Sequence, residues 1–303
     1  MAIGAEVRGT FLLAGATATG KSAVVQYLAE QHGATLLSAD AMLVYRGMDI
    51  GTAKPSQEER LRVPYYGLDC VTPAETFSSA RWLESLAQSE TAPLRFVTGG
   101  TGLYFSLLLR GLDPAPPVDS ERRATLEALP LAELQARLAQ RKVTLEDMQN
   151  PRRLIRALEI LESGGSLPRG WGSKAKVKLP ALLWPRALLH ARIAERVRKM
   201  YQSGLLEETR ALRTAYPEWS RTANQAIGYA EAGAVLDGKV TRAEAIEQTI
   251  IRTRQLARRQ ETYLRGQFEV TWIACSSSDT VPMIAERVWA VWEKDGAAKL
   301  ATL

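Results

Sequence analysis

Cysteine and histidine are scarce in this chain of 303 residues, which contains two of each. Cys70 and Cys275 are far apart and in no metal-ligand spacing, so we interpret them as ordinary thiols rather than a disulfide or a metal site. His32 and His190 both lie outside the motifs that carry the functional interpretation. This pattern predicts a reducing, cytoplasmic setting.

Long apolar runs are also absent. No uninterrupted apolar segment approaches the roughly 20 residues that a membrane helix needs, and the N-terminus has no basic segment followed by an apolar one. Hydrophobic residues nevertheless make up 46% of the chain, which is enough to bury a large core and to form two units. We therefore expect a soluble enzyme with no membrane partner, and a monomer.

The first motif is a glycine-rich loop over residues 15–22, which reads Gly-Ala-Thr-Ala-Thr-Gly-Lys-Ser. It follows the apolar run 11–14 and precedes a helix-like stretch over 23–31, which is the order of a phosphate-binding loop. Backbone N–H groups can curl around an anion there, while Lys21 supplies charge and Ser22 offers a hydroxyl to Mg²⁺. The predicted diphosphate-binding residues are Gly15, Thr17, Ala18, Thr19, Gly20, Lys21 and Ser22, and Ser22 is the predicted metal ligand.

A phosphate loop alone does not name a reaction. The strand expected over 94–97 ends in Thr-Gly-Gly-Thr-Gly without an acid, which weakens the ATPase and kinase interpretations because such enzymes usually have an aspartate there. An acid instead follows the strand expected over 35–38, at Asp40. Because the carboxyl ends of parallel strands line one crevice, we expect Asp40 and Thr101 to face the phosphate loop.

Six separated segments resemble, in the same order, signatures of the tRNA dimethylallyltransferases, also called tRNA isopentenyltransferases. They are the phosphate loop and residues 45–55, 99–104, 156–159, 225–229 and 253–260. The resemblance implies an α/β fold, with a P-loop-type doubly wound parallel sheet as its core and a helical insertion domain. It also implies transfer of a dimethylallyl group from dimethylallyl diphosphate to the exocyclic N6 amine of the adenosine beside the tRNA anticodon, with release of diphosphate.

This chemistry assigns roles to particular residues. Thr19, Lys21 and Ser22 would hold the diphosphate and Mg²⁺, and Asp40 would accept the amine proton as general base. The resemblance gives Thr101 a contact with the target nucleotide, which must first leave its stack. The residues expected to contact tRNA are Asp40, Ala41, Met42, Leu43, Thr101, Arg123, Arg152, Arg153, Leu154, Ile155 and Arg156.

Three positions depart from the family pattern. Ala41 replaces a common serine, so a hydroxyl contact is missing. The pair at 65–66 is Tyr-Tyr rather than His-His, which disfavours proton transfer by this segment near neutral pH. Gln225 replaces an arginine that helps to hold diphosphate in some members, and one hypothesis is that arginines within 254–259 supply that charge.

The pattern of elements predicts the domain organisation. Strands and helices alternate to residue 110, a proline-rich segment follows, and residues 118–178 read as the helical insertion for tRNA binding between core segments 1–117 and 179–303. We expect a mobile linker over 163–180 and a frayed tail over 295–303.

Charge is unevenly distributed along the chain. The formal net charge is −2 over residues 1–117, +4 over 118–178 and +6 over 179–265, so a polyanion is expected on the later segments. The alternative is a solvated surface of mixed charge, with the arginines of 152–156 paired to Glu159 and Glu162.

Two alternative functions also stay open. One is prenylation of free adenine nucleotides, and the other is a nucleotide-dependent switch or kinase.

Overall fold

The computed structural model describes residues 8–111, 119–145, 147–165, 167 and 175–301. The chain divides into two compact units, a core unit formed by Met1–Gly111 with Lys174–Leu303 and a helical unit formed by Leu112–Ser173. Each unit has its own buried apolar residues.

The core unit is built on one sheet of six strands in the order β3-β2-β4-β1-β5-β6, in which every neighbouring pair is parallel. The strands are β1 (Gly9–Gly15), β2 (Thr35–Ser38), β3 (Tyr65–Tyr66), β4 (Leu94–Gly99), β5 (Ala175–Leu183) and β6 (Phe268–Ala274). The central strands β1, β2 and β4 are almost wholly buried, as expected for strands covered by helices on both faces. This arrangement confirms the doubly wound parallel sheet predicted from the sequence.

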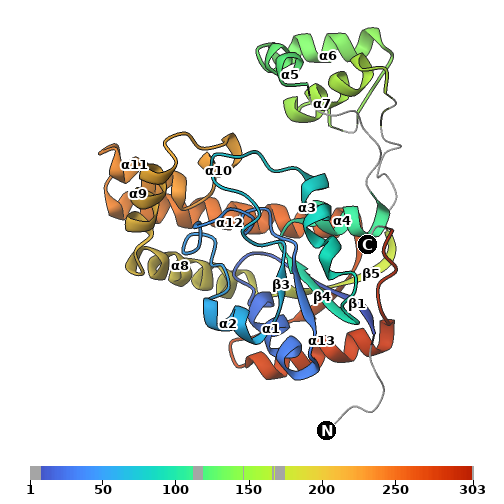
Figure 1. Ribbon diagram of the computed structural model, residues 1–303, viewed down its shortest axis with the longest axis vertical. Coiled ribbons are helices and arrows are strands. Elements are labelled where there is room, and N and C mark those ends of the chain that lie inside the picture. The colour runs from blue at the N-terminus through green and yellow to red at the C-terminus, as the bar shows by residue number, and fades with distance from the viewer. Residues whose placement is uncertain (1–7, 112–118, 146, 166, 168–174, 302–303) are drawn as a thin grey trace. The chain divides into compact units, whose positions relative to one another are not determined.

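Helices cover both faces of the sheet. Figure 1 shows α1 and α13 on one side and α4 and α12 on the other. The helices that flank the sheet are α1 (Lys21–His32), α2 (Gln57–Arg62), α3 (Ser79–Leu86), α4 (Gly102–Arg110) and α13 (Val281–Asp295), and a 3₁₀ turn covers Ala87–Ser89. Beneath α13, a cluster of Phe11, Phe96 and Trp292 packs ring against ring, and the Trp292 Nε1–H donates to the carbonyl of Leu12 at 2.9 Å.

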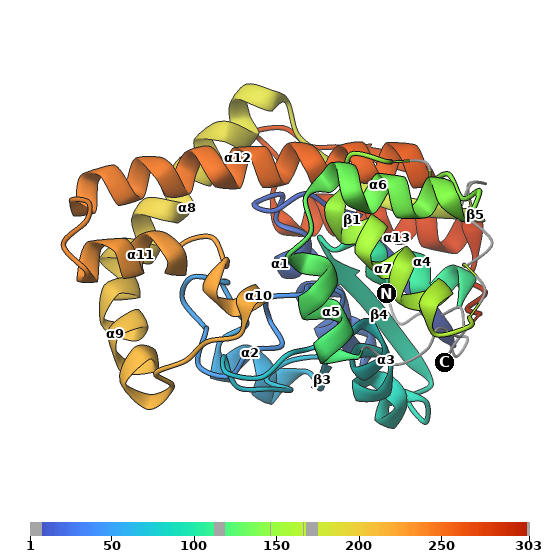
Figure 2. The same cartoon turned by 90° about the horizontal axis from the view of Figure 1, so that it is seen from above.

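A second group of helices extends from the sheet. It comprises α8 (Arg186–Gln202), α9 (Leu205–Ala215), α10 (Arg221–Asn224), α11 (Tyr229–Leu236) and α12 (Arg242–Gln267). Figure 2 shows α12 running the length of the core unit, with α8, α9 and α11 gathered around its first half. Thr241 begins α12 with a capping box, because its hydroxyl accepts from the Glu244 N–H while the Glu244 carboxylate accepts from the Thr241 N–H.

The helical unit contains α5 (Ser120–Glu127), α6 (Leu131–Gln140) and α7 (Pro151–Glu162). Asn150 and Pro151 open α7 as the sequence predicted, since proline suits the first turn of a helix. The buried core of this unit consists of Leu126, Leu134, Leu138, Leu154, Ile155, Ala157 and Leu158. These positions recur at helical spacing, so each helix turns one apolar face inward.

Two expectations about irregular segments are wrong. Part of the expected linker, residues 175–180, forms the first six of the nine residues of β5 and pairs with β6, while residues 168–174 lie outside the described residues. The expected frayed tail is tied to the core unit as far as residue 301, because the Ala298 N–H donates to Thr10 O and the Ala301 N–H to Leu108 O, both at 2.8 Å. Backbone pairing, which leaves no trace in local composition, decides both segments.

Candidate active site

The phosphate loop joins the end of β1 to the first residue of α1. Ala18 and Gly20 both have positive φ angles, of 64° and 87°, and only Gly20 adopts this region without strain from a side chain. The Thr19 hydroxyl donates to Ala16 O at 2.8 Å. From behind, Trp184 Nε1 donates to Thr19 O and Arg192 Nε to Ala18 O, both at 2.9 Å, so the residue that follows β5 and a side chain of α8 fix the shape of the loop.

Lys21 is the buried charge of this loop. Its side chain is 7% exposed, and its Nζ donates to Ala16 O at 3.3 Å. Burial lowers the pKa of Lys21 to about 8, against the raising effect of the Asp40 carboxylate and with a further lowering by Arg196. A bound diphosphate would place negative charge beside this buried ammonium group and stabilise its charged form.

Binding of inorganic diphosphate should therefore depend on pH through Lys21. Below pH 8 the lysine is already charged, whereas above it each binding event must also bring a proton, so affinity attributable to Lys21 falls as pH rises through 8. Calorimetry between pH 7 and 9, in buffers of different ionisation enthalpy, measures this proton uptake. Lys21→Arg is the matched control because arginine stays charged throughout this range. Equal proton uptake by both proteins would contradict the assignment.

Asp40 follows β2 and is held beside Thr101. The Thr101 N–H donates to Ala39 O and the Ala41 N–H donates to Thr101 Oγ1, both at 3.0 Å. The Met42 N–H donates to Asp40 Oδ1 at 3.0 Å and fixes the carboxylate. As expected, the structure brings Asp40, Thr101 and the phosphate loop together at the carboxyl ends of the parallel strands.

An enclosed cavity, the small cavity, joins these groups. Its lining combines the side chains at the start of α1, Asp40 and Arg196 with apolar side chains such as Val25 and Leu36. The lining residues are Thr17, Lys21, Ser22, Val25, Leu36, Leu37, Ser38, Asp40, Leu43, Thr52, Ala53, Pro55, Tyr65, Leu68, Thr98, Gly99 and Arg196. Cationic and apolar side chains in one cavity suit a ligand with an anionic head and a hydrocarbon tail.

Arg196 is a site residue that the sequence interpretation missed. It projects from α8, lines the small cavity and also a more open one that borders Ala18, Gly20, Arg192 and Lys199, and donates through Nη2 to Thr52 O at 3.2 Å. The second cation of the small cavity is thus Arg196, and the hypothesis that arginines of 254–259 take this place is not supported by its lining. The spacing of Arg192, Arg196 and Lys199 on one helix face was the available signal.

The signature on α12 supports the site rather than supplying its charge. Gln260 Oε1 accepts the Thr17 N–H at 2.8 Å, and a side chain at Gly100 would meet Gln260 Nε2 at 2.2 Å. A side chain at Gly102 would meet the Tyr263 ring at the same distance. The glycines of the 99–102 loop therefore allow α12 to cross directly over it.

The signature over residues 45–55 is also a support. Lys54 is buried and its Nζ donates to Tyr45 O at 2.6 Å and to the carboxylates of Asp49 and Asp69 at 2.6 and 2.7 Å. Tyr229, from the 225–229 signature, accepts the Gly51 N–H at 3.1 Å through its hydroxyl. These contacts hold residues 52–55 against the small cavity.

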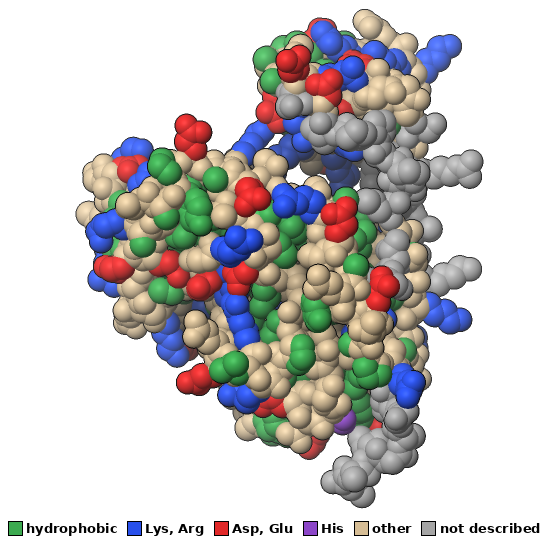
Figure 3. Space-filling view, viewed as in Figure 1, with side chains coloured by type: hydrophobic (Ala, Val, Ile, Leu, Met, Phe, Trp, Pro, Cys, Tyr) green, Lys and Arg blue, Asp and Glu red, His purple; other side chains and the backbone are tan. Residues whose placement is uncertain are grey.

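The tRNA-contact residues expected on the helical unit fall into two groups. Leu154 and Ile155 are 0% and 6% exposed and belong to the core of that unit, so their side chains are packing residues, and a tRNA contact at these two positions stays a prediction for the backbone alone. Arg123 and Arg156 both approach the buried Glu159, at 2.9 and 3.3 Å, as the alternative of paired arginines predicted. Arg152 and Arg153 are exposed. Figure 3 shows acidic and basic side chains interspersed on the visible face of this unit.

The small cavity offers oxygen ligands but no preformed metal centre. Within the described ranges, no three histidine, cysteine, aspartate or glutamate side chains gather as a metal site. The Ser22 hydroxyl and the Asp40 carboxylate line the same cavity. Because Mg²⁺ prefers oxygen ligands and usually binds together with substrate phosphates and water, these residues fit a magnesium ion that arrives with a diphosphate.

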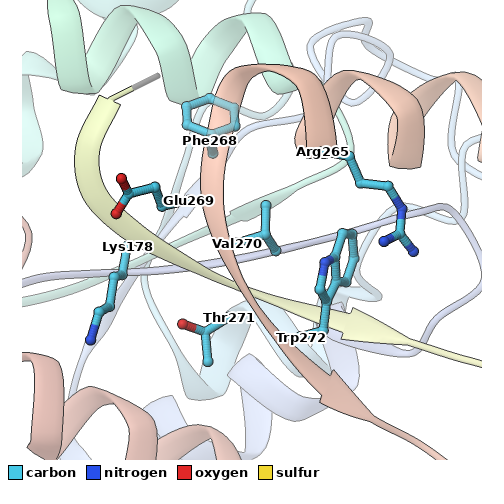
Figure 4. Close-up of a pocket in the computed structure, with 7 residues that line it drawn as sticks. All are labelled: Lys178, Arg265, Phe268, Glu269, Val270, Thr271 and Trp272. Atoms are coloured by element: carbon cyan, nitrogen blue, oxygen red, sulfur yellow. The ribbon is translucent and has the colours of Figure 1, made fainter. Parts of the chain in front are cut away.

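A different hollow lies at the far edge of the sheet, where β6 is paired on one side only. Figure 4 shows that Lys178, Arg265 and residues 268–272 line it, with the Arg265 guanidinium 4.4 Å from the centre of the Trp272 ring. This residue set includes no predicted catalytic or phosphate-binding residue.

No helix within the described segments is long and apolar enough to span a membrane.

Fold and site together define a P-loop-type α/β protein with two cations and a carboxylate around an enclosed, partly apolar cavity. Comparison with known proteins makes the assignment specific. Two family models match, one described as IPP transferase over residues 43–267 and one described as isopentenyl transferase over residues 8–64. The chain therefore belongs to the tRNA dimethylallyltransferase family.

Individual relatives agree with this placement. The chain is 41% identical over 282 residues to a tRNA dimethylallyltransferase of Anaeromyxobacter dehalogenans, covering 87% of this chain and 94% of the relative. It is also 41% identical over 273 residues to that of Thermus thermophilus, covering 84% and 89%. Among solved structures, the full-length tRNA isopentenylpyrophosphate transferase of Bacillus halodurans matches with a TM-score of 0.67 and 32% identity, covering 95% of this chain and 96% of the other.

Proposed function

We propose that this protein transfers a dimethylallyl group from dimethylallyl diphosphate to the N6 amine of the adenosine beside the anticodon of tRNA. The observation that carries the proposal is the small cavity, in which Lys21 and Arg196 lie near Asp40 and apolar side chains. Relatives named tRNA dimethylallyltransferases support the choice of group and acceptor.

The residues have distinct roles in this reaction. The N6 nitrogen bonds to the carbon of the dimethylallyl group that carries the diphosphate. The bond from this carbon to the diphosphate oxygen breaks, and its electron pair leaves with the diphosphate. Lys21, Arg196 and backbone N–H groups of the phosphate loop stabilise the departing anion. Asp40 takes the proton that N6 loses.

Two further groups would assist. Thr101 accepts the Ala41 N–H, so its own O–H can donate to the target nucleotide while it holds the Asp40 loop. A magnesium ion bound with the diphosphate would have Ser22 as a ligand and would offset part of the phosphate charge.

Burial raises the pKa of Tyr65, so this phenol is unsuited to proton transfer near neutral pH.

The helical unit is proposed to bind the anticodon stem-loop. Arg152 and Arg153 lie exposed on the first turn of α7, where guanidinium groups can contact phosphates or stack on bases. The helical unit is the proposed insertion domain, and residues 175–178 of the predicted span 118–178 belong instead to β5 of the core unit. We further propose that the protein acts as a cytoplasmic monomer.

Arg153→Ala should weaken tRNA binding and reduce its salt dependence by about one unit of log–log slope, because one phosphate contact is lost. Affinity for dimethylallyl diphosphate should not change. Filter binding over a range of salt concentrations measures the slope. Arg137→Ala is the matched control, since Arg137 is on α6 and pairs with Glu133 at 3.1 Å. An unaltered slope in Arg153→Ala would show that Arg153 only faces solvent.

One experiment separates the candidate reactions. The protein is incubated with labelled dimethylallyl diphosphate and either bulk tRNA or AMP, and the tRNA is then digested to nucleosides for mass analysis. Label in a tRNA adenosine supports the proposal, and label in AMP supports prenylation of free nucleotides instead. Transfer to neither, together with ATP hydrolysis, would support a nucleotide-dependent switch or kinase.

A further inference from the structure

The small cavity has an apolar lining as well as a phosphate end. Lys21 and Ser22 stand at the start of α1, and Asp40 follows the carboxyl end of β2. Val25 of α1, Leu36 of β2 and Tyr65 of β3 line the same cavity. The roles assigned so far place the hydrocarbon tail against this apolar lining but do not say which residue limits its length.

Tyr65 lies about one helical turn from the phosphate end. Gln26 follows Ser22 by four residues of α1, which corresponds to about 6 Å along the helix axis. On the sheet, Tyr65 of β3 is the register partner of Leu36 of β2, which precedes Asp40 by four residues. The helix route corresponds to about 6 Å, which is comparable with the length of one isoprene unit. The sheet route spans up to about 13 Å at the rise of a strand, so it shows only that Tyr65 lies away from Asp40.

The Tyr65 ring is held firmly in this place. Its hydroxyl donates to Gln26 Oε1, and Gln26, 5% exposed, in turn donates to Glu30 Oε1 at 2.7 Å and to Glu59 O at 3.1 Å. Because the ring is tied to both the α1 surface and the β3 backbone, it cannot swing aside without breaking this partly buried chain of hydrogen bonds. It therefore acts as a wall rather than a flexible liner.

We infer that Tyr65 sets the length of the prenyl chain that the enzyme accepts, by closing the cavity beyond one isoprene unit. A dimethylallyl tail would lie between Val25, Leu36 and the tyrosine ring, which line this cavity together, whereas a ten-carbon geranyl tail would meet the ring. A hydrophobic pocket that must reject a larger tail does so by such a clash. The inference rests on the proposed prenyl transfer and adds a determinant of its substrate class.

The test compares dimethylallyl and geranyl diphosphate as donors to the same tRNA. Wild-type protein should prefer the five-carbon donor by at least about 100-fold in kcat/KM, and Tyr65→Ala should narrow this ratio at least about tenfold by accelerating geranyl transfer. Tyr65→Phe keeps the ring and should keep most of the ratio. Tyr66→Ala is the matched control, because Tyr66 is the next residue of β3 and its side chain points to the opposite face.

Binding of non-reactive thio analogues gives a second measurement that does not need turnover. Tyr65→Ala should bind the geranyl analogue at least about tenfold more tightly than the wild-type protein does. If the wild-type protein transfers the dimethylallyl group but Tyr65→Ala leaves both the donor ratio and the analogue affinities unchanged, the chain-length role is wrong while the proposed function stands. If the wild-type protein transfers neither group to tRNA, the proposed function fails and this inference with it.

Discussion

Asp40→Asn is expected to lower turnover by roughly two to four orders of magnitude, the usual scale for loss of a general base. Asparagine has the same shape and can still accept the Met42 N–H through its side-chain oxygen, so the loop should keep its conformation. Its amide cannot take the proton that N6 loses. Single-turnover transfer at saturating substrates measures the chemical step directly.

Two further measurements show that the loss is chemical. Affinity for tRNA should stay close to that of the wild-type protein, and Glu84→Gln, which neutralises an exposed carboxylate on α3, should leave turnover unchanged. Asp40 also raises the pKa of Lys21, so its neutralisation should lower that pKa further and weaken diphosphate binding as pH rises above 7. An unaltered single-turnover rate in Asp40→Asn would remove this residue from the role of base.

The parts of the site that follow from local sequence were predictable. The glycine loop between a strand and a helix indicates its own conformation, and the position of Asp40 follows from the rule that parallel strands end at one edge. Arg196 and Gln260 were different, because Arg196 reaches the small cavity and Gln260 the loop from helices far along the chain, and Gln260 is separated from Thr17 by 243 residues. The spacing of Arg192, Arg196 and Lys199 indicates a basic helix face, but no local pattern says which loop or cavity a helix side chain reaches.

Burial explains the remaining differences. Leu154 and Ile155 stand inside a basic segment that resembles a tRNA-contact motif, but their apolar side chains complete the core of the helical unit. The flanking residues Arg152 and Arg153 stay exposed on the first turn of the same helix. A motif on an amphipathic helix thus contains both exposed and packing residues, and only the structure separates them.

Gly99→Ala is expected to lower the free energy of unfolding by roughly 1–3 kcal/mol, the usual range for forced overpacking in a core. Gly99 ends β4 beside the residue that precedes Asp40, and a Cβ there would lie 2.0 Å from Ala39 O. Its neighbour is backbone, so relief requires β2 and β4 to separate where Ala39 N–H donates to Thr98 O at 2.7 Å. Denaturant unfolding measures the loss.

Gly266→Ala provides the matched control, because nothing lies within 4 Å of its added methyl group on α12. That variant should be unchanged or more stable by up to about 1 kcal/mol, as alanine favours a helix over glycine. Separation of β2 from β4 would also move the Asp40 carboxylate relative to Lys21, so Gly99→Ala should lose transfer activity at temperatures where it is still folded. A Gly99→Ala protein as stable and active as Gly266→Ala would show that the two strands can part there without disturbing the site.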